Sequence, residues 1–293
     1  MRGAEEGLLL LCCKLGQPVK PLTPTEYLQM RALAVAKAPV IGSLGDVTPE
    51  YLSSLGYSED MTDRILSLLN RPRILRDYLA AQKDVCVITR LDAERFPRRL
   101  RRLGGDCPAT LFCRGDIRLL NTRCVAAVGS RRLLSRGRAF AQEVGRRAAE
   151  EGFTLVSGNA AGADSAAQDA CLQAGGRVVC FVPDELTRYA PRENVLYCSA
   201  DGYDLPFSAA RALYRNLLIH ALGEKTFVAQ CPAASGGTWS GASENLKRGL
   251  SDVYVLDDGS KGADALCALG ASPVEDRLPS IGALRSRQLS IFD

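Results

Sequence analysis

Three short segments of the sequence combine glycine with serine or threonine, and each follows an apolar stretch that predicts a β-strand. They are Gly129-Ser130-Arg131, Ser157-Gly158 and Ser235-Gly236-Gly237-Thr238. Glycine lets an anion approach the backbone amides, hydroxyl groups add hydrogen-bond donors, and the Arg131 guanidinium pairs well with phosphate. Because ligands of parallel sheets bind where the strands end, three such segments predict a phosphate-binding site.

The glycines also have a purely structural interpretation, in which they let helices pack closely against the sheet. One segment alone would favour packing, whereas three at equivalent positions favour phosphate binding. In the stretch SGNAAGADSAAQDA (157–170), Asp164 is expected early in a helix, as a cap or as an anchor for the loop. No G-x-G-x-x-G follows the first strand and no G-x-x-x-x-G-K-S/T occurs, which disfavours dinucleotide-dependent oxidoreductases and P-loop enzymes.

The charged residues give a weaker indication of a phosphate-bearing partner. Lys and Arg number 37 against 33 Asp and Glu, for a net charge of +4, and most of the basic residues are arginine. Arginines gather at 90–102 and at 131–138. Such clusters are typical of nucleic-acid-binding surfaces and of ordinary solvated surfaces alike, so the clusters alone do not decide between them.

Other residue types narrow the classes of function. The single histidine, His220, lies in an apolar helical stretch and is expected to pack there, which disfavours His-rich metal centres and most Ser-His-Asp sites. Eleven cysteines without a C-x-x-C pair indicate reduced thiols in a cytoplasmic protein. No apolar stretch approaches the roughly 18 residues of a membrane span, and residues 8–13 are expected to be a buried helical turn. No metal and no cofactor are expected.

The elements that must position these residues change in kind near residue 82. Up to that point the pattern is helical, with helices expected at 24–38, 48–55 and 58–69. Beyond it, short apolar runs alternate with helical stretches. The expected strands are 85–89, 111–114, 124–129, 154–157, 177–182, 226–230 and 253–256. The expected helices lie near 136–151, 163–174, 208–222, 241–249 and 262–269.

This alternation predicts an α/β fold. Apolar strands separated by helices are typical of a Rossmann-like, doubly wound, mostly parallel sheet, here preceded by a small all-helical N-terminal domain. The expected domains are residues 1–82, residues 83–271 and a C-terminal tail at 272–293.

From about residue 85 to residue 271, the order and spacing of the motifs resemble the DNA-processing protein DprA (Smf) family. The matching segments are ITRLDAERFPRRLRRLGGDCPATLFCRGDIRLL, VAAVGSRR, SGNAAGADSAAQDACLQAGGRVV, YAPRENVL, YRNLLIHAL, SGGTWSGASENLKRGLSDVYVL and ALCALGA. Each is weak by itself, and their order makes the set specific. The sequence has Ala161, Gln168 and Leu217 where the family has Arg, His and Arg, and it ends without the winged-helix domain of many members.

The resemblance implies a Rossmann-like domain that binds single-stranded DNA, forms a homodimer and loads a RecA-type recombinase during DNA uptake and recombination, behind a sterile-alpha-motif-like N-terminal domain. Helix N-termini, Arg131 and Arg215 would hold backbone phosphates regardless of base sequence. Phe207 or Trp239 would stack a base. Asn216 contacts sugar or base, or caps its own helix, and the sequence leaves both open. No catalytic residue is expected.

Two other classes of function stay open. The resemblance extends to nucleotide phosphoribohydrolases of the lysine-decarboxylase-like type, whose signature is Pro-Gly-Gly-x-Gly-Thr-x-x-Glu. The segment GGTWSGASE (236–244) contains the glycines, Thr238 and Glu244, but the spacing differs, so Glu244 is expected on the surface of a helix. A module that senses a free nucleotide is the other alternative, because the same segments would hold a free phosphate.

The C-terminal residues 287–293 read RQLSIFD and form a separate motif. They resemble the Gln-Leu-Ser/Asp-Leu-Phe peptide by which bacterial replication and repair proteins bind the sliding clamp. Gln288 would make polar contacts, and Leu289, Ile291 and Phe292 would fill apolar pockets. The alternative is that Ile291 and Phe292 fold back onto the surface of the protein itself.

Overall fold

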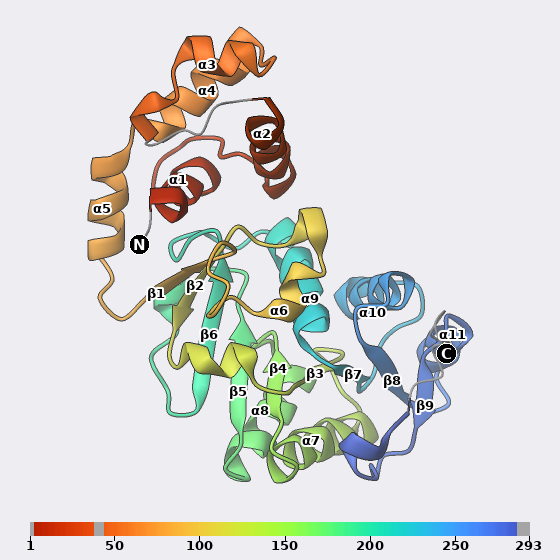
Figure 1. The fold of residues 1–293 in the computed structure, drawn as a ribbon. Coiled ribbons are helices and arrows are strands. Elements are labelled where there is room, and N and C mark those ends of the chain that lie inside the picture. The colour runs from red at the N-terminus through yellow and green to blue at the C-terminus, as the bar shows by residue number, and fades with distance from the viewer. Residues whose placement is uncertain (1–2, 38–43, 286–293) are drawn as a thin grey trace.

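The computed structural model describes residues 3–37 and 44–285 of the chain (Figure 1). Among these residues, nine strands form one sheet in the order β1-β2-β6-β5-β4-β3-β7-β8-β9. β2 runs antiparallel to both β1 and β6, and the other neighbours are parallel. The predicted α/β, mostly parallel, doubly wound sheet is therefore confirmed.

Seven of the strands were predicted to within two residues, and β6 and β9 were not predicted. All six residues of β6 are buried, between β5 and β2 in the sheet, so the strand shows no alternation of polar and apolar residues. The strands are β1 (Cys86–Thr89), β2 (Thr110–Arg114), β3 (Cys124–Val128), β4 (Thr154–Ser157), β5 (Arg177–Phe181), β6 (Val195–Ala200), β7 (Lys225–Val228), β8 (Asp252–Leu256) and β9 (Ser272–Val274).

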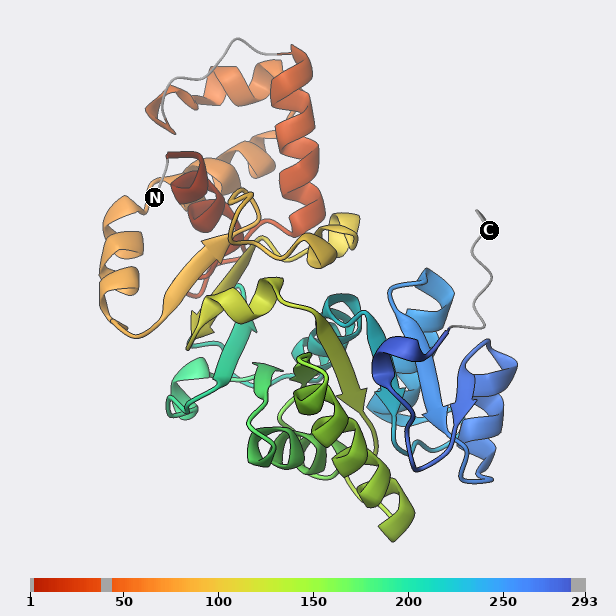
Figure 2. The same ribbon diagram turned by 60° about the horizontal axis from the view of Figure 1, so that its bottom comes forward.

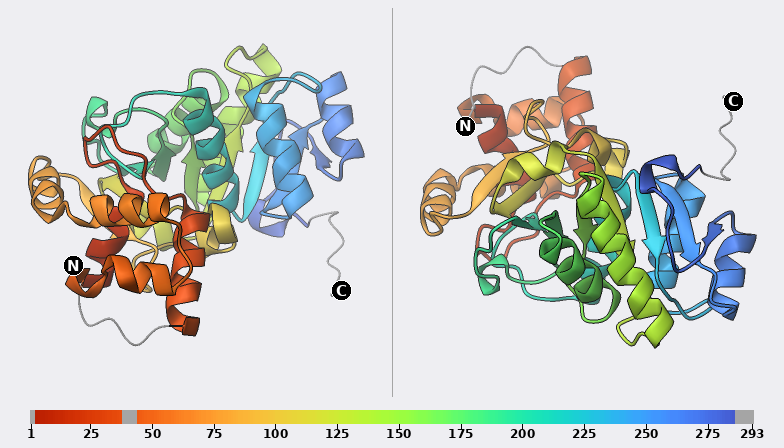
Figure 3. Two further views of the ribbon diagram at one scale, coloured as in Figure 1. Left: turned by 90° about the horizontal axis from the view of Figure 1, so that it is seen from above. Right: turned by 90° about the horizontal axis from the view of Figure 1, so that it is seen from below.

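Helices cover both faces of the sheet, as Figures 2 and 3 show. α7 (Ser135–Glu150) and α8 (Ala163–Gln173) lie on one face, and α9 (Ala209–Leu222) and α10 (Gly236–Arg248) lie on the other. In β3, alternate residues belong to the core on the α7 side and to the core on the α9 side. This double burial explains the continuous apolar runs that predicted a parallel sheet. The remaining helix of this region is α11 (Lys261–Ala268).

The N-terminal region is helical, as predicted, and lies beside the β1 edge of the sheet (Figure 1). Thr23 and Glu26 form a capping box, in which each side chain bonds the backbone N–H of the other residue, at the start of the expected second helix. The helices are α1 (Gly3–Cys12), α2 (Pro24–Lys37), α3 (Pro49–Ser54), α4 (Glu59–Leu69), α5 (Pro72–Ala80) and, after β1, the short α6 (Arg98–Arg101). No described helix is long and apolar enough to cross a membrane.

The apolar run of α1 joins the helical region to the sheet. Leu8 and Leu11 pack in the core of the helical region, whereas Leu9 and Leu10 pack in the core that contains the sheet. A helix that is apolar all round is expected where it is covered on several sides. α5, which was not predicted, makes a second connection, because the Tyr78 hydroxyl bonds both the Asp204 carboxylate and the Tyr203 backbone N–H.

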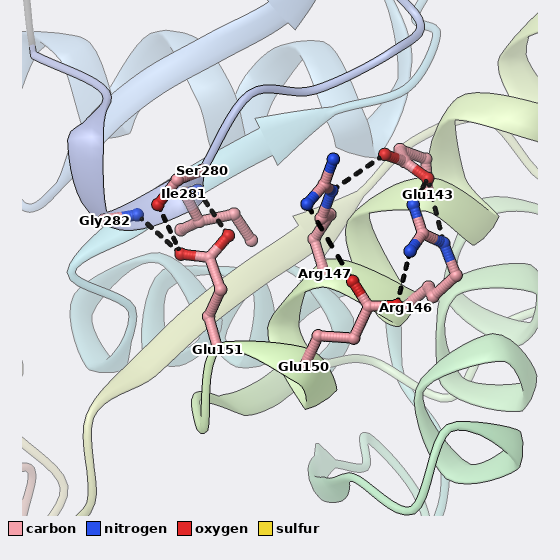
Figure 4. Close-up of polar contacts among 8 residues, drawn as sticks. All are labelled: Glu143, Arg146, Arg147, Glu150, Glu151, Ser280, Ile281 and Gly282. Carbon is pink, nitrogen blue, oxygen red and sulfur yellow. Dashed lines mark hydrogen bonds and ion pairs between the residues drawn. The ribbon is translucent and has the colours of Figure 1, made fainter.

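The residues from 272 onward, expected as a tail, include ordered elements. β9 extends the sheet beside β8, and the 3-10 turn η5 (Ile281–Ala283) packs on the sheet with Ile281 fully buried. The Glu151 carboxylate accepts hydrogen bonds from Ser280 Oγ and from the backbone N–H groups of Ile281 and Gly282 (Figure 4). The RQLSIFD motif, with Gln288, Leu289, Ile291 and Phe292, lies outside the described residues.

Candidate nucleic-acid interface

The three glycine-containing segments follow three neighbouring strands. Gly129-Ser130-Arg131 follows β3, Ser157 ends β4 and Gly158 follows it, and Ser235 to Thr238 comes after β7. The sheet order is β4-β3-β7. From β3 the chain winds through β4 and β5 in one direction, and from β7 it winds through β8 and β9 in the other. The segments therefore meet at the topological switch point, where open α/β sheets bind their ligands.

The first two segments interlock with each other. Ala163 N–H donates to Ser130 O (3.1 Å), and Gly129 packs so closely that a Cβ there would lie 2.7 Å from Ala163 Cβ. Gly162, at φ +87°, leaves no room for a Cβ against the carbonyl oxygens of Ser130 and Arg131. These glycines serve close packing between the turn after β3 and the start of α8, which matches the structural interpretation that glycine lets helices pack closely against the sheet.

Beneath the second segment, Asp164 and Arg215 form a buried pair of opposite charges. Asp164 Oδ2 accepts from the N–H groups of Gly158 (3.1 Å) and Ala160 (3.2 Å), so its predicted role as loop anchor is confirmed. Arg215 donates to the carbonyls of Gly158 and Phe181 and is only 8% exposed. Burial raises the pKa of Asp164, opposed by the charge of Arg215, and burial lowers the pKa of Arg215. Neither side chain faces solvent, so the prediction that Arg215 contacts phosphate directly does not match its position.

The Ser157 hydroxyl is also used inside the protein. Gln168 Nε2 donates to Ser157 Oγ (2.8 Å), and both residues are buried. Gln168, one of the departures from the family pattern, therefore supports the turn after β4. The second departure, Ala161, is exposed, and the third, Leu217, packs partly buried against the core.

Solvent reaches the first segment mainly at its arginine. Ser130 Oγ lies within the turn, bonding both O and N of Arg132, whereas Arg131 is exposed and makes no hydrogen bond or ion pair within the described residues. Three more exposed arginines follow at 132, 136 and 138, and α7 begins here without a side-chain cap. Uncapped N–H groups beside exposed guanidinium groups attract anions.

Gln230, which the sequence analysis did not single out, bonds the chain that follows β7 to the chain that follows β3. Its backbone carbonyl accepts from Ser130 N–H (2.8 Å), and its Oε1 accepts from Leu134 N–H (3.0 Å) at the start of α7. A polar residue directly after an apolar strand, opposite two glycine segments, is a signal that could have identified it.

In the third segment, residues 235–237 are exposed to solvent. α10 begins at Gly236, five residues earlier than predicted, and its N-cap residue Ser235 makes no capping hydrogen bond. Gly236 has open space around its Cα, and Gly237 is exposed. Asn216 Nδ2 donates to Gly237 O (3.2 Å), so Asn216 supports the first turn of α10 and does not cap its own helix, which begins after the N-cap Ser208.

Two exposed apolar side chains lie at and just before α9. Phe207, directly before α9, is 57% exposed, and Leu213 on α9 is 51% exposed. Trp239 packs partly buried against the core. Of the two aromatic residues predicted to stack a base, Phe207 is therefore the accessible one.

The arginines at 90–102 mostly serve the fold. Arg99 donates to the carbonyls of Ala221, Gly223 and Leu250, at the ends of α9 and α10, and Arg101 donates to two carbonyls of its own loop. Arg98 and Arg102 are exposed. Among the described residues, no group of three His, Cys, Asp or Glu side chains could hold a metal ion.

Comparisons with known proteins identify relatives of the sheet region. A family model described as DNA recombination-mediator protein A matches residues 87–281. Protein Smf of Borreliella burgdorferi is 28% identical over 207 residues, 66% of this chain and 65% of that protein. DNA processing protein DprA of Bacillus subtilis is 23% identical over 192 residues, 65% of this chain and 61% of that protein. The chain thus matches less than two thirds of the length of these relatives.

Two solved structures resemble the chain. DNA processing protein A from Streptococcus pneumoniae aligns with a TM-score of 0.73 at 23% identity, covering 94% of this chain and 96% of that one. DNA processing protein A from Helicobacter pylori, whose structure was described for its single-stranded DNA binding mode, aligns with a TM-score of 0.56 at 26% identity, covering 64% and 90%. Since the family model spans residues 87–281, the chain belongs to the DNA recombination-mediator protein A family.

Proposed function

We propose that this chain binds single-stranded DNA across the switch point of its sheet and mediates recombination of the bound strand. The observation that carries the proposal is the arrangement of the two uncapped helix N-termini, those of α7 and α10, which follow the neighbouring strands β3 and β7. Backbone phosphates would lie at these termini, with Arg131 as counter-charge.

Base contacts would come from the exposed apolar groups. Phe207 offers a ring on which any base can stack, so binding is expected to tolerate all sequences and to weaken with salt. Asp164 and Arg215 support the loop between them, which keeps the exposed residues in place. The Helicobacter pylori relative, described as binding single-stranded DNA, supports the same ligand for this chain.

The partners proposed for the bound complex follow from the family resemblance. The DNA-bound chain would act as a homodimer and transfer its strand to a RecA-type recombinase, during DNA uptake and recombination. A strand-exchange assay with a recombinase and a single-strand-binding protein tests this transfer: addition of the chain should shorten the lag, and an unchanged lag would contradict the transfer while leaving DNA binding intact.

Binding to DNA is tested by titrating labelled oligo-dT, and separately AMP, at two salt concentrations. Arg131→Ala should weaken oligo-dT binding and lower the slope of log K against log salt by about one, because about one phosphate contact is lost. Arg118→Ala is the matched control. Arg118 is an exposed arginine paired with Asp116, and it lies before the start of β3, whereas Arg131 lies after the end of that strand. Loss of binding in Arg98→Ala, with Arg131→Ala unchanged, would move the site to the arginines at 90–102.

The AMP titration separates the other function classes. Glu244 lies exposed on α10, 3.8 Å from Arg248, and the hollow that it lines includes Ser240 and Gly241 but not Gly236 or Gly237. We expect no release of base or ribose phosphate from AMP. Release that disappears in Glu244→Ala would favour a nucleotide phosphoribohydrolase, and tight AMP binding without turnover would favour a nucleotide sensor.

The clamp-binding role of Gln288, Leu289, Ile291 and Phe292 stays a prediction from the sequence. The described residues that precede it are held to the sheet, since Lys225 Nζ donates to the carbonyls of Ile281 (2.6 Å) and Leu284 (2.7 Å). A peptide of residues 285–293 should bind purified sliding clamp, and the Phe292→Ala peptide should not. No binding by the wild-type peptide would contradict the prediction.

A further inference from the structure

Three cysteines form a row across the antiparallel part of the sheet. Cys86 on β1 lies opposite Cys113 on β2, and Cys113 lies opposite Cys198 on β6. Directly opposed residues of neighbouring strands project from the same face, so the three thiols are aligned. The Sγ atoms of Cys113 and Cys198 are 3.6 Å apart. None of the three cysteines belongs to the candidate DNA surface.

The backbone around Cys113 and Cys198 suits a cross-strand disulfide. Asp201 N–H donates to Thr110 O, and hydrogen-bonded pairs alternate along antiparallel strands. Cys113 and Cys198 lie three positions from that pair and therefore form a non-hydrogen-bonded pair, with Cα atoms about 4.5 Å apart. This separation lies inside the range of Cα distances that a disulfide bridges. Oxidation therefore needs only movement of the two side chains.

Access to the pair runs through the edge strand. Cys113 and Cys198 have no exposed surface, whereas Cys86 is partly exposed. Burial raises the pKa of the Cys198 thiol, and burial also raises the pKa of Cys86. A small disulfide in solution reaches only Cys86 directly, and the buried thiols react only by exchange along the row.

We propose that Cys113 and Cys198 form a reversible disulfide, generated through Cys86 by exchange with a low-molecular-weight disulfide. The Cys86 thiolate attacks the small disulfide and releases one small thiol. The Cys113 thiolate then attacks Cys86 Sγ and releases the second small thiol, and the Cys198 thiolate attacks Cys113 Sγ and frees Cys86. Two protein thiols are oxidised, one small disulfide is reduced to two thiols, and the two thiol protons end on those products.

The position of the bond indicates its effect. β2 and β6 join the antiparallel edge of the sheet, which carries the helical region, to its parallel part. β6 continues into the loop that holds Phe207 and into α9. A disulfide between these strands would close a loop of about 85 residues and stabilise the junction of the two regions.

The test uses the full chain, folded and freed of reductant, with glutathione disulfide as oxidant. Non-reducing peptide mapping should find a peptide pair linked through Cys113 and Cys198. The oxidised protein should unfold at a temperature higher by about 5 °C or more, and dithiothreitol should reverse the shift. Because raised pKa values leave little thiolate at neutral pH, the link should form faster at pH 8.5 than at pH 7.

Two variants test the exchange route through Cys86 separately from the formation of the Cys113–Cys198 disulfide. Cys86→Ala should form the Cys113–Cys198 link at least tenfold more slowly than the wild-type chain, whereas Cys124→Ala, which removes a buried thiol of β3, should match the wild type. Equal rates in Cys86→Ala and wild type would overturn the exchange route. Absence of the linked peptide pair in the wild-type chain would overturn the proposal, and that measurement does not depend on any variant folding.

Discussion

At the scale of single residues, the polar groups at the switch point divide into those that reach solvent and those that build the loop. Arg131 is exposed and makes no ion pair within the described residues. Arg215 and Asp164 are buried and bonded to backbone groups of the loop after β4, and Ser157 is buried and bonded to the Gln168 side chain. Substituting Arg215 would therefore disturb the loop without removing a phosphate contact, which separates it from Arg131 in a salt titration.

The only histidine of the chain belongs to a buried polar cluster. His220 Nδ1 lies 3.3 Å from Thr226 Oγ1 and 3.2 Å from Asn245 Nδ2, which also bonds Ser251 Oγ. Burial lowers the pKa of His220 to about 4. The predicted packing role is confirmed.

This cluster gives a dependence of stability on pH. In the unfolded chain the imidazole takes up a proton near pH 6.5, while in the folded chain it stays neutral to about pH 4, so stability is lost as the pH falls between these values. Between pH 7.5 and pH 4 the free energy of unfolding of wild type should fall by about 3 kcal/mol more than that of His220→Gln. Urea unfolding at both pH values measures it, and equal losses would show that His220 is protonated in the fold.

At the scale of elements, two glycines with positive φ lie at the starts of helices on opposite faces of the sheet, and their surroundings differ. Gly162, at φ +87°, precedes α8 and touches the turn after β3, whereas Gly236, at φ +80°, begins α10 in open space. An alanine is strained in both backbones, and at residue 162 it also collides with neighbouring carbonyls.

Gly162→Ala should therefore lower the free energy of unfolding by about 3 kcal/mol or more, and Gly236→Ala by only about 1 kcal/mol. Denaturant titration compares the two. A similar loss in both variants would mean that the turn after β3 shifts freely, and the interlocked segments would then not fix the site.

At the scale of the whole molecule, the C-terminal residues fasten the last strand to the middle of the sheet. Partial burial raises the pKa of Glu151, but hydrogen bonds from Gly282, Ile281 and Ser280 outweigh this and hold the pKa below its usual 4.5. Leu278 and Ile281 are buried in the core on the α7 side. Attachment of this segment therefore depends on the ionised Glu151 carboxylate, on the Lys225 ammonium group and on two apolar side chains.

Glu151→Gln should loosen the segment. Trypsin should cut after Arg277 roughly tenfold faster in this variant, because cleavage there requires release of Leu278 and Ile281 from the core. Glu150→Gln is the matched control, since its neighbouring carboxylate bonds only Arg146 and Arg147 on the surface of α7 (Figure 4). Equal cleavage in both variants would show that apolar packing alone holds the segment. In wild type the contact should weaken only as the pH falls through the lowered pKa of Glu151.

Local patterns determined most of the elements. Apolar runs indicated seven strands, and the helical pattern from residue 24 indicated α2, because strand burial and helix periodicity depend on residues close in sequence. β6 was not predicted because an entirely buried strand shows no alternation of polar and apolar residues. α5 is short but amphipathic, with Leu75 and Tyr78 buried, so its periodicity was present in the sequence and was missed. The glycine segments were correctly expected where strands end, since each follows an apolar run and the end of such a run is visible in the sequence itself.

What each side chain does at the switch point was decided by the tertiary structure. The sequence placed Arg131, Ser157 and Gly237 at or after strand ends and Arg215 within a helix, and all four looked equally able to contact a phosphate. Burial depends on which strands and helices become neighbours, and the order β4-β3-β7 with α9 across it buried Arg215 and Ser157 and left Arg131 and Gly237 in solvent. A charge is costly to bury without a partner, so the fold that buried Arg215 also required Asp164 beside it.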